Sequence, residues 1–186
     1  DSGMSRGLGD VYKRQCVLNL GNILEEFSNI GGIVVGTNDL AKELVLPKQT
    51  GRAGLLYALG SIILTAKAYN VITLDGVFNG ISDEEGLRSE AEEGKNMGYD
   101  GKTLIHPNQI GITNAVFSPT EKEIDLANKI IEAYEKAKEE KSGVTTVDGV
   151  LVEELHVKQS LALISKMKMI QSTVSYTHLT LPTKSG

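Results

Sequence analysis

The sequence predicts an α/β fold in which short parallel strands alternate with helices, and two observations lead to this class. Three short runs, at residues 33–35, 71–74 and 102–105, each end in a loop marked by a glycine, an acid or a proline, as strands do. Between them, apolar residues recur every three or four positions, which is the period of an amphipathic helix. The order strand, helix, strand, helix, strand therefore predicts parallel strands joined by right-handed crossovers.

The first strand carries the most informative residues of the chain. The run at residues 33–35 is β-branched and uncharged, which predicts a strand covered on both faces. Gly36 ends this strand, and Asp39 follows it closely. In α/β barrels the carboxyl ends of the strands carry the chemistry, so Asp39 is a candidate metal or substrate ligand. The alternative is that Asp39 only caps a helix that begins near Leu40.

Helices are predicted before the first strand and between successive strands. A short helix is expected at residues 22–27 and a longer one at residues 53–69. The longer helix has an apolar stripe made of Leu55, Leu56, Leu59, Ile62, Ile63 and Ala66. Ser82 or Asp83 caps a third helix, which ends at Gly98.

Asp75 and His106 also follow predicted strands, so with Asp39 they place three acids or imidazoles at one edge of the sheet. Two alternatives remain open, because Asp75-Gly76 could be an ordinary turn and His106 could bond to the backbone beside Pro107. No second histidine or cysteine stands at zinc-ligand spacing. Any metal should therefore be a hard ion held by carboxylate oxygen and water, magnesium first.

The C-terminal third predicts an arm or lid instead of another crossover unit. Thr120 with Glu123 forms a capping box that opens a helix. Residues 144–152 read as a β-hairpin, because the dipeptide Asp148-Gly149 suits a type I′ turn. A last helix is expected at residues 157–169.

Composition excludes several classes of function. The net charge of −5 gives no basic surface for a nucleic acid. The lysines at residues 122–141 alternate with glutamates, which indicates a solvated helix face, so no nucleic-acid partner is expected. No apolar run approaches the ~20 residues of a membrane span, so a soluble cytoplasmic protein without a membrane partner is expected. Cys16 is the only cysteine, which excludes an intramolecular disulfide. Dinucleotide, phosphate-loop and serine-nucleophile signatures are all absent.

The motifs resemble a known family. They are Gly36-Thr-Asn-Asp-Leu-Ala-Lys-Glu-Leu44, Leu55-Leu-Tyr-Ala-Leu59, Leu74-Asp-Gly-Val-Phe78, Gly98-Tyr-Asp-Gly-Lys-Thr-Leu-Ile-His-Pro-Asn-Gln-Ile110 and Val147-Asp-Gly-Val150. In this order and spacing they are similar to the citrate lyase β-subunit-like family of the HpcH/HpaI aldolase group, which includes malyl-CoA and related acyl-CoA lyases. The resemblance covers most of residues 16–173.

The resemblance implies the C-terminal portion of a (β/α)₈ TIM barrel, with its last three strands and helices, followed by a helix–hairpin–helix lid. The partial barrel domain is expected at residues 16–118 and the arm or lid at residues 119–173. Residues 1–15 and 174–186 look like translated sequencing-adapter read-through, so both are expected to be foreign to the protein.

The activity implied is a magnesium-dependent carbon–carbon lyase acting on a 3-hydroxyacyl-CoA of the malyl-CoA, citramalyl-CoA or citryl-CoA type. The implied partners are an acyl-CoA thioester, a small keto acid and further copies of the chain. Asp39 matches the family's aspartate ligand of magnesium, and Gly36, Thr37 and Asn38 would contact the substrate. Asp148 matches an aspartate that works in proton transfer in a neighbouring subunit's site.

One departure from the family pattern bears on activity. The glutamate that completes the magnesium site would stand, by counting, at Tyr12, and the earlier strands with a substrate arginine and much of the CoA groove are missing. A single fixed ligand holds magnesium poorly, so the chain is expected to be inactive as it stands. The alternatives are a phosphoenolpyruvate- or pyruvate-handling barrel without CoA, or a non-catalytic interaction subunit.

Overall fold

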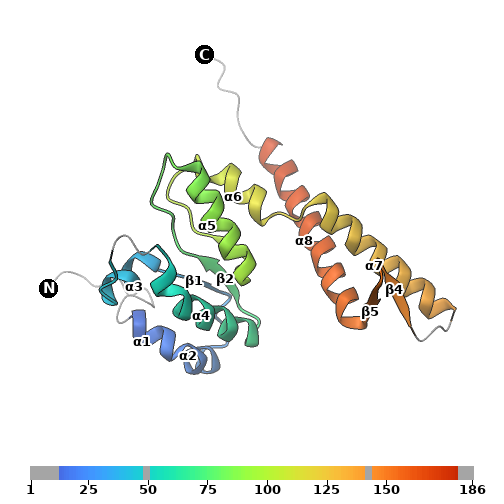
Figure 1. Cartoon of the computed structure of the whole chain (residues 1–186), viewed down its shortest axis with the longest axis horizontal. Coiled ribbons are helices and arrows are strands. Elements are labelled where there is room, and N and C mark those ends of the chain that lie inside the picture. The colour runs from blue at the N-terminus through green and yellow to red at the C-terminus, as the bar shows by residue number, and fades with distance from the viewer. Residues whose placement is uncertain (1–12, 48–50, 141–143, 180–186) are drawn as a thin grey trace, which may run out of the picture. The chain divides into compact units, whose positions relative to one another are not determined.

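A computed structural model describes residues 13–47, 51–140 and 144–179, and it divides the chain into two compact units that meet between Phe117 and Ser118 (Figure 1). The first unit contains α1 (Lys13–Leu18), α2 (Leu20–Glu26), β1 (Gly32–Val34), α3 (Thr37–Glu43), the 3₁₀ helix η1 (Ala53–Leu55), α4 (Leu56–Ala68), β2 (Ile72–Asp75), α5 (Glu84–Met97), β3 (Gly101–Lys102) and α6 (Gln109–Phe117). The second unit contains α7 (Glu121–Glu139), β4 (Thr145–Val147), β5 (Val150–Val152) and α8 (Glu154–Leu179).

The first unit is built on a parallel sheet with the strand order β1-β2-β3. Ile33 pairs with Thr73, and Asp75 pairs with Lys102. Helices α3 and α4 connect β1 to β2, and α5 connects β2 to β3, which confirms the predicted α/β class with parallel strands. All three strands therefore end at the same edge of the sheet, as the sequence predicts for Asp39, Asp75 and His106.

The prediction that β1 is covered on both faces is wrong. Val34 is 60 % exposed, and Ile72 of β2, which pairs with Gly32, is 55 % exposed. Within the described residues β1 is an edge strand of a three-stranded sheet, so its outer side has no strand paired with it. Val35, just after the strand, is buried in the core, and Ile33 is partly buried against it.

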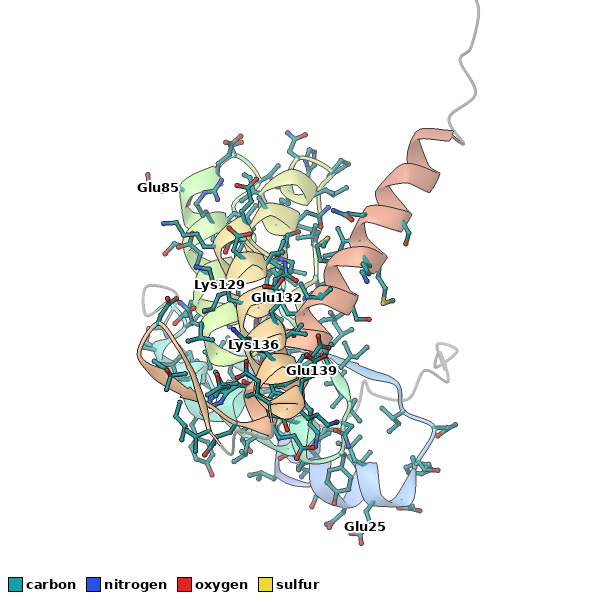
Figure 2. All side chains as sticks on the ribbon, turned by 90° about the vertical axis from the view of Figure 1, so that its right-hand side faces the viewer. Glu25, Glu85, Lys129, Glu132, Lys136 and Glu139 are labelled. Carbon is teal, nitrogen blue, oxygen red and sulfur yellow. The ribbon has the colours of Figure 1, made fainter. Side chains whose placement is uncertain are left out.

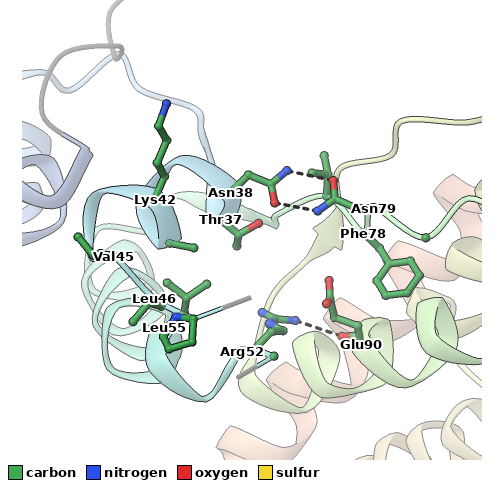
Figure 3. Close-up of a pocket in the computed structure, with 15 residues that line it drawn as sticks. Thr37, Asn38, Lys42, Val45, Leu46, Arg52, Leu55, Phe78, Asn79 and Glu90 are labelled. Atoms are coloured by element: carbon green, nitrogen blue, oxygen red, sulfur yellow. Dashed lines mark hydrogen bonds between the residues drawn. The ribbon is translucent and has the colours of Figure 1, made fainter. Parts of the chain in front are cut away.

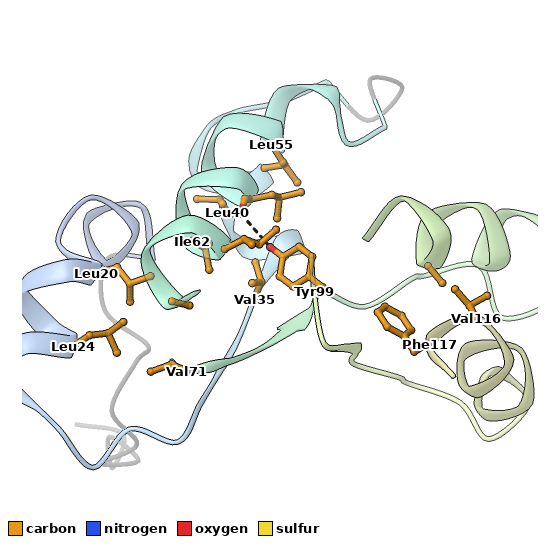
Figure 4. Close-up of a cluster of buried hydrophobic side chains, with 14 residues drawn as sticks. Leu20, Leu24, Val35, Leu40, Leu55, Ile62, Val71, Tyr99, Val116 and Phe117 are labelled. Carbon is orange, nitrogen blue, oxygen red and sulfur yellow. Dashed lines mark hydrogen bonds between the residues drawn. The ribbon is translucent and has the colours of Figure 1, made fainter. Parts of the chain in front are cut away.

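Apolar side chains from α2, α3, α4 and the end of β1 form the core of the first unit (Figure 4). Four residues of the predicted stripe on α4 are buried in it, namely Leu59, Ile62, Ile63 and Ala66. Tyr99 packs into the same core. Burial raises the pKa of its phenol, and the negative charge of Asp75 raises this pKa further, whereas the positive charge of Arg52 lowers it.

The side chain of Asp100 joins β2 to α4 by hydrogen bonds. The carboxylate of Asp100 accepts bonds from Lys67 Nζ at 2.7 and 2.8 Å and from the backbone N–H of Thr73 at 2.9 Å. Burial raises the pKa of Asp100, but these bonds and the Lys67 charge outweigh it and hold the pKa below its usual value. Asp100 therefore stabilises the fold above its ordinary pKa, and this contribution is lost as acid protonates it.

Several element boundaries differ from the predicted ones. Helix α1 starts at Lys13, inside the segment set aside as foreign, and α6 follows Pro107 where no helix was predicted. Helix α8 runs to Leu179, ten residues beyond the predicted end at Met169, because no glycine or proline interrupts it there. Strand β3 has two residues instead of the four predicted, although Thr103 N–H still donates to Asp75 O at 2.9 Å.

The caps and the hairpin form as predicted. Asp83 accepts the backbone N–H of Gly86 at 2.9 Å and caps α5. Both halves of the capping box at Thr120 are present. At the turn between β4 and β5, Asp148 has φ 51° and Gly149 has φ 81°, the positive values that a type I′ turn requires.

We expect Thr120→Ala to lower the free energy of unfolding of the second unit by about 1 kcal/mol, because it leaves the N–H of Glu123 without its cap. Glu123→Gln is the matched control, since glutamine can also complete a capping box. Urea unfolding followed by circular dichroism compares the two variants. Equal losses in both would show that the Thr120 hydroxyl does not cap the helix.

Helix α7 shows the charge pattern that the sequence predicts for a solvated face. Lys129, Glu132, Lys136 and Glu139 recur at three- and four-residue spacing and are all exposed (Figure 2). None of the helices in the described part of the chain combines the length and the apolar character that a membrane span requires.

Candidate functional site

Asp39 lies on the exposed first turn of α3, directly after β1. The helix begins at Thr37 with Gly36 at its N-cap, and no side chain caps it. The alternative that Asp39 caps a helix starting near Leu40 is therefore wrong, because Asp39 is already the third helical residue. Its carboxylate stands at the sheet edge where the parallel strands end.

A cavity of about 780 Å³ opens beside this turn, between α3, the segment after it, α5 and the β2 loop, which we define as residues 76–83 (Figure 3). Thr37, Asn38 and Asn79 provide polar groups on its wall, and Val45, Leu46 and Phe78 provide apolar ones. Arg52 and Glu90 add opposite charges. The cavity thus combines an apolar wall with a few polar groups, as small-molecule sites do.

Two of the three predicted substrate contacts lie on this cavity. Thr37 and Asn38 line it, whereas Gly36 lines a separate and more apolar cavity of about 910 Å³ bordered by α1, α2 and β1. Asn38 also forms a reciprocal amide pair with Asn79, with N···O distances of 3.0 and 2.8 Å (Figure 3).

Asp75 does not form the ordinary turn that was left open, because it is the last residue of β2 and is fully buried. The guanidinium of Arg52 donates to both of its oxygens, Nη1 to Oδ2 and Nη2 to Oδ1, each at 2.9 Å. The backbone N–H of Gly76 donates to Oδ1 at 2.8 Å. A buried carboxylate needs such partners, and the fork of an arginine supplies two of them in one plane.

Lys102 completes the buried cluster from β3. Its fully buried ammonium donates to Asp75 Oδ2 at 3.1 Å, to Glu90 Oε1 at 2.6 Å and to the carbonyl of Gly76 at 2.8 Å. These three bonds use all three N–H donors of the ammonium. We call Arg52, Asp75, Glu90 and Lys102 the buried charge cluster; its two positive and two negative side chains balance.

The buried charge cluster was missed by the sequence analysis, except for Asp75. Arg52 precedes the apolar stripe of α4, and Glu90 reads as one more acid of an amphipathic helix. The one available signal was Lys102, a charged residue inside a run predicted to be a strand of the parallel sheet, because a lysine that is buried in a sheet needs an acidic partner. Gly94 gives a second sign in the structure, since a Cβ there would lie 2.7 Å from Asp75 Oδ2.

His106 bonds to the backbone, which is the second of the two alternatives left open by the sequence. Its Nδ1 accepts the backbone N–H of Asn108 at 3.2 Å, which makes it a residue that shapes the turn before α6. Of the three predicted edge residues, Asp39 is therefore the one whose side chain is exposed.

Asp39 has the chemistry of a magnesium ligand, because it is an exposed carboxylate. It follows Thr37 and Asn38 on the same turn but is not itself one of the residues that line the cavity. Among the described residues, however, no three histidine, cysteine, aspartate or glutamate side chains come close enough to hold a metal ion. Tyr12, which stands at the position of the family's glutamate, lies outside the described residues. Asp39 thus fits as one ligand of an incomplete set.

Asp148 lies in the second unit, at the tip of the β4–β5 hairpin, where its side chain is exposed. It is one of three non-glycine residues with positive φ in the described chain, the others being Val45 and Asn70. Its exposure leaves the carboxylate open to a partner in solution.

The fold and this site define an α/β protein with a cavity at the carboxyl edge of a parallel sheet and an exposed acid, Asp39, on a turn that borders it. Residues 10–107 match the model of the HpcH/HpaI aldolase/citrate lyase family. The chain belongs to that family.

Two curated relatives show how the similarity is distributed. The (3S)-malyl-CoA thioesterase of Cereibacter sphaeroides is 48 % identical over 141 residues, which are 76 % of this chain and 50 % of that protein. Citrate lyase subunit beta of Leuconostoc mesenteroides is 32 % identical over 163 residues, which are 86 % of this chain and 54 % of that protein. The chain therefore spans about half the length of the curated relatives that it matches.

Solved structures support the fold. CitE of Mycobacterium tuberculosis, in complex with magnesium, acetoacetate and coenzyme A, superposes with a TM-score of 0.67 at 22 % identity, covering 83 % of this chain and 58 % of that one. A second CitE structure from the same organism, with magnesium and acetoacetate, gives a TM-score of 0.51 at 26 % identity over 57 % of this chain and 46 % of that one. The chain therefore has an α/β fold similar to that of citrate lyase β-subunit proteins.

Proposed function

We propose that this chain is the C-terminal part of a magnesium-dependent carbon–carbon lyase that cleaves a 3-hydroxyacyl-CoA of the malyl-CoA, citramalyl-CoA or citryl-CoA type. The observation that carries the proposal is the placement of Asp39, which follows a parallel strand on the same helical turn as Thr37 and Asn38, two residues that line the cavity. The relatives support the substrate class, since they include a malyl-CoA thioesterase and citrate lyase β subunits, and a similar CitE structure holds magnesium and acetoacetate.

The residues present suit part of this reaction. Asp39 would hold the magnesium ion, which supplies Lewis-acid polarisation of the keto-acid oxygens when bound. Thr37 and Asn38 would orient the small acid against the cavity wall. Asp148, exposed on its hairpin, would move a proton in the site of a neighbouring copy, and the three-stranded sheet would be completed by further barrel strands.

Thioester hydrolysis is the second candidate, because a relative that is 48 % identical is a (3S)-malyl-CoA thioesterase. The products separate the two reactions. A lyase releases glyoxylate and acetyl-CoA from malyl-CoA, whereas a thioesterase releases malate and free CoA. A pyruvate-handling barrel without CoA, or a non-catalytic subunit, would release neither pair.

We expect no turnover of malyl-CoA by the 186-residue chain alone, and magnesium-dependent release of glyoxylate once it is joined behind the N-terminal half of the Cereibacter sphaeroides relative. In that chimera, Asp39→Asn should lower kcat/KM on the order of 100-fold, because it removes a ligand of the ion. Asp125→Asn, the same change at an exposed aspartate of α7, is the matched control and should leave the rate unchanged.

Trapping glyoxylate as its phenylhydrazone and titrating free thiol measure the two product pairs in the same sample. Release of free CoA without glyoxylate would show that the chimera hydrolyses the thioester and does not cleave the carbon–carbon bond. If Asp39→Asn leaves kcat/KM of the chimera unchanged, Asp39 is not a ligand of the metal ion.

A further inference from the structure

The β2 loop is fixed from below by buried side chains. At its start, Gly76 is bonded on both sides, through its N–H to Asp75 Oδ1 and through its carbonyl to Lys102 Nζ, each at 2.8 Å. Two residues on, the carbonyl of Phe78 accepts a bond from Gln109 Nε2 at 3.0 Å. Gln109 is only 1 % exposed, and its Oε1 accepts the backbone N–H of Ile105, so its amide cannot turn away.

The first turn of α3, which carries Asp39, is held by two backbone bonds and by one buried side chain. The N–H of Thr37 donates to Val35 O at 3.1 Å, and the N–H of Leu40 donates to Gly36 O at 3.0 Å. The side chain of Leu40 lies in the core of the first unit. The helix has seven residues, so it is too short to be stable by itself.

Two contacts join this turn to the β2 loop. The side chain of Thr37 lies directly over Gly76, so close that a Cβ on Gly76 would collide with it. Next to it, Asn38 and Asn79 exchange two amide bonds across the gap between the segments (Figure 3). Each amide donates once and accepts once, an arrangement that sets both distance and orientation.

We infer that Asn79 is a positioning residue for Asp39. Its two bonds to Asn38 fix the turn that carries Asp39 against the β2 loop, which the buried charge cluster and Gln109 hold in place. The inference rests on the proposed function for the role of Asp39. The coupling itself is a property of this chain. Asn79 need not touch substrate or metal, since it acts through Asn38, the residue next to Asp39.

Backbone hydrogen exchange measured by NMR on the 186-residue chain tests the coupling without any assay of activity. We expect Asn79→Ala to speed exchange at the N–H groups of Thr37 and Leu40 about tenfold, as expected for the loss of two exposed hydrogen bonds. Exchange in α4, at Ile62 and Ile63, should stay at the wild-type rate. Asn114→Ala, the same change at an exposed asparagine of α6, is the matched control and should alter neither region.

Asn38→Ala and the double variant complete the test. If the two side chains act through one another, the double variant exchanges no faster than either single variant. Unchanged exchange at Thr37 and Leu40 in Asn79→Ala would overturn the inference. Faster exchange throughout the first unit would also overturn it, because Asn79 would then serve overall stability and not the position of Asp39. An inactive chimera would contradict the proposed function and leave this result intact.

Discussion

Lys102→Met is expected to lower the free energy of unfolding of the first unit by about 3–5 kcal/mol, because it removes one partner of a buried ion pair and leaves the others in place. Asp75 would keep Arg52 and the N–H of Gly76, but Glu90 Oε1 and the carbonyl of Gly76 would lose their donor. A loss of this size is a large part of the stability of a small domain. Urea unfolding followed by circular dichroism measures it.

Lys158→Met is the matched control, since it makes the same change at an exposed ion pair. Lys158 lies 2.9 Å from Glu154 on the surface of α8, and exposed pairs contribute little because water and salt screen them. We expect the control to behave like the wild type. If Lys102→Met prevents folding, Glu90→Gln provides a milder test, since it keeps a side chain of similar shape and removes only one charge. A wild-type unfolding curve for both buried variants would show that the cluster does not stabilise the unit.

Gly76→Ala is expected to have the second largest effect, a loss of about 1–3 kcal/mol from overpacking. The added Cβ would collide with Oγ1 and Cγ2 of Thr37 and would lie 2.8 Å from its Cβ. Thr37 is β-branched and cannot turn both branches away, so the backbone at the carboxyl edge has to separate. The same urea experiment measures the loss.

Gly60→Ala is the control for this substitution. A Cβ at Gly60 would meet no atom within 4 Å, and the residue lies within α4, where alanine favours the helix by up to about 1 kcal/mol. We therefore expect equal or higher stability. Adding Thr37→Ala should recover part of the loss in Gly76→Ala, and a recovery of nothing would show that the collision is not with Thr37.

Local patterns in the sequence predicted much of the fold. The period of apolar residues located α4 and its buried face, and the residues at helix starts located the caps at Asp83 and Thr120. The Asp148-Gly149 dipeptide located the hairpin. These features succeed because each depends on neighbours within a few positions, where hydrogen bonding and side-chain period follow directly from the order of residues.

The candidate site was predicted only in part. The motif around Asp39 located two residues of the cavity wall, Thr37 and Asn38, whereas the role of Asp39 itself stays a prediction. The exposure of Val34 was not foreseen, because a β-branched run does not say how many strands cover it. Asp75 was expected at the sheet edge but its role was open, since an Asp-Gly pair by itself is compatible with a turn or with a buried strand end.

By itself, then, the sequence determined the class of fold and the alternation of its elements, since these follow from local period and from short motifs. Only the tertiary structure decided that the carboxylate of Asp75 forms ion pairs with Arg52 and Lys102, which lie 23 and 27 residues away from it along the chain. The same holds for the amide pair of Asn38 and Asn79, which joins residues 41 positions apart. Pairings of this kind depend on which loops the parallel strands bring to one edge, and that is a property of packing in three dimensions.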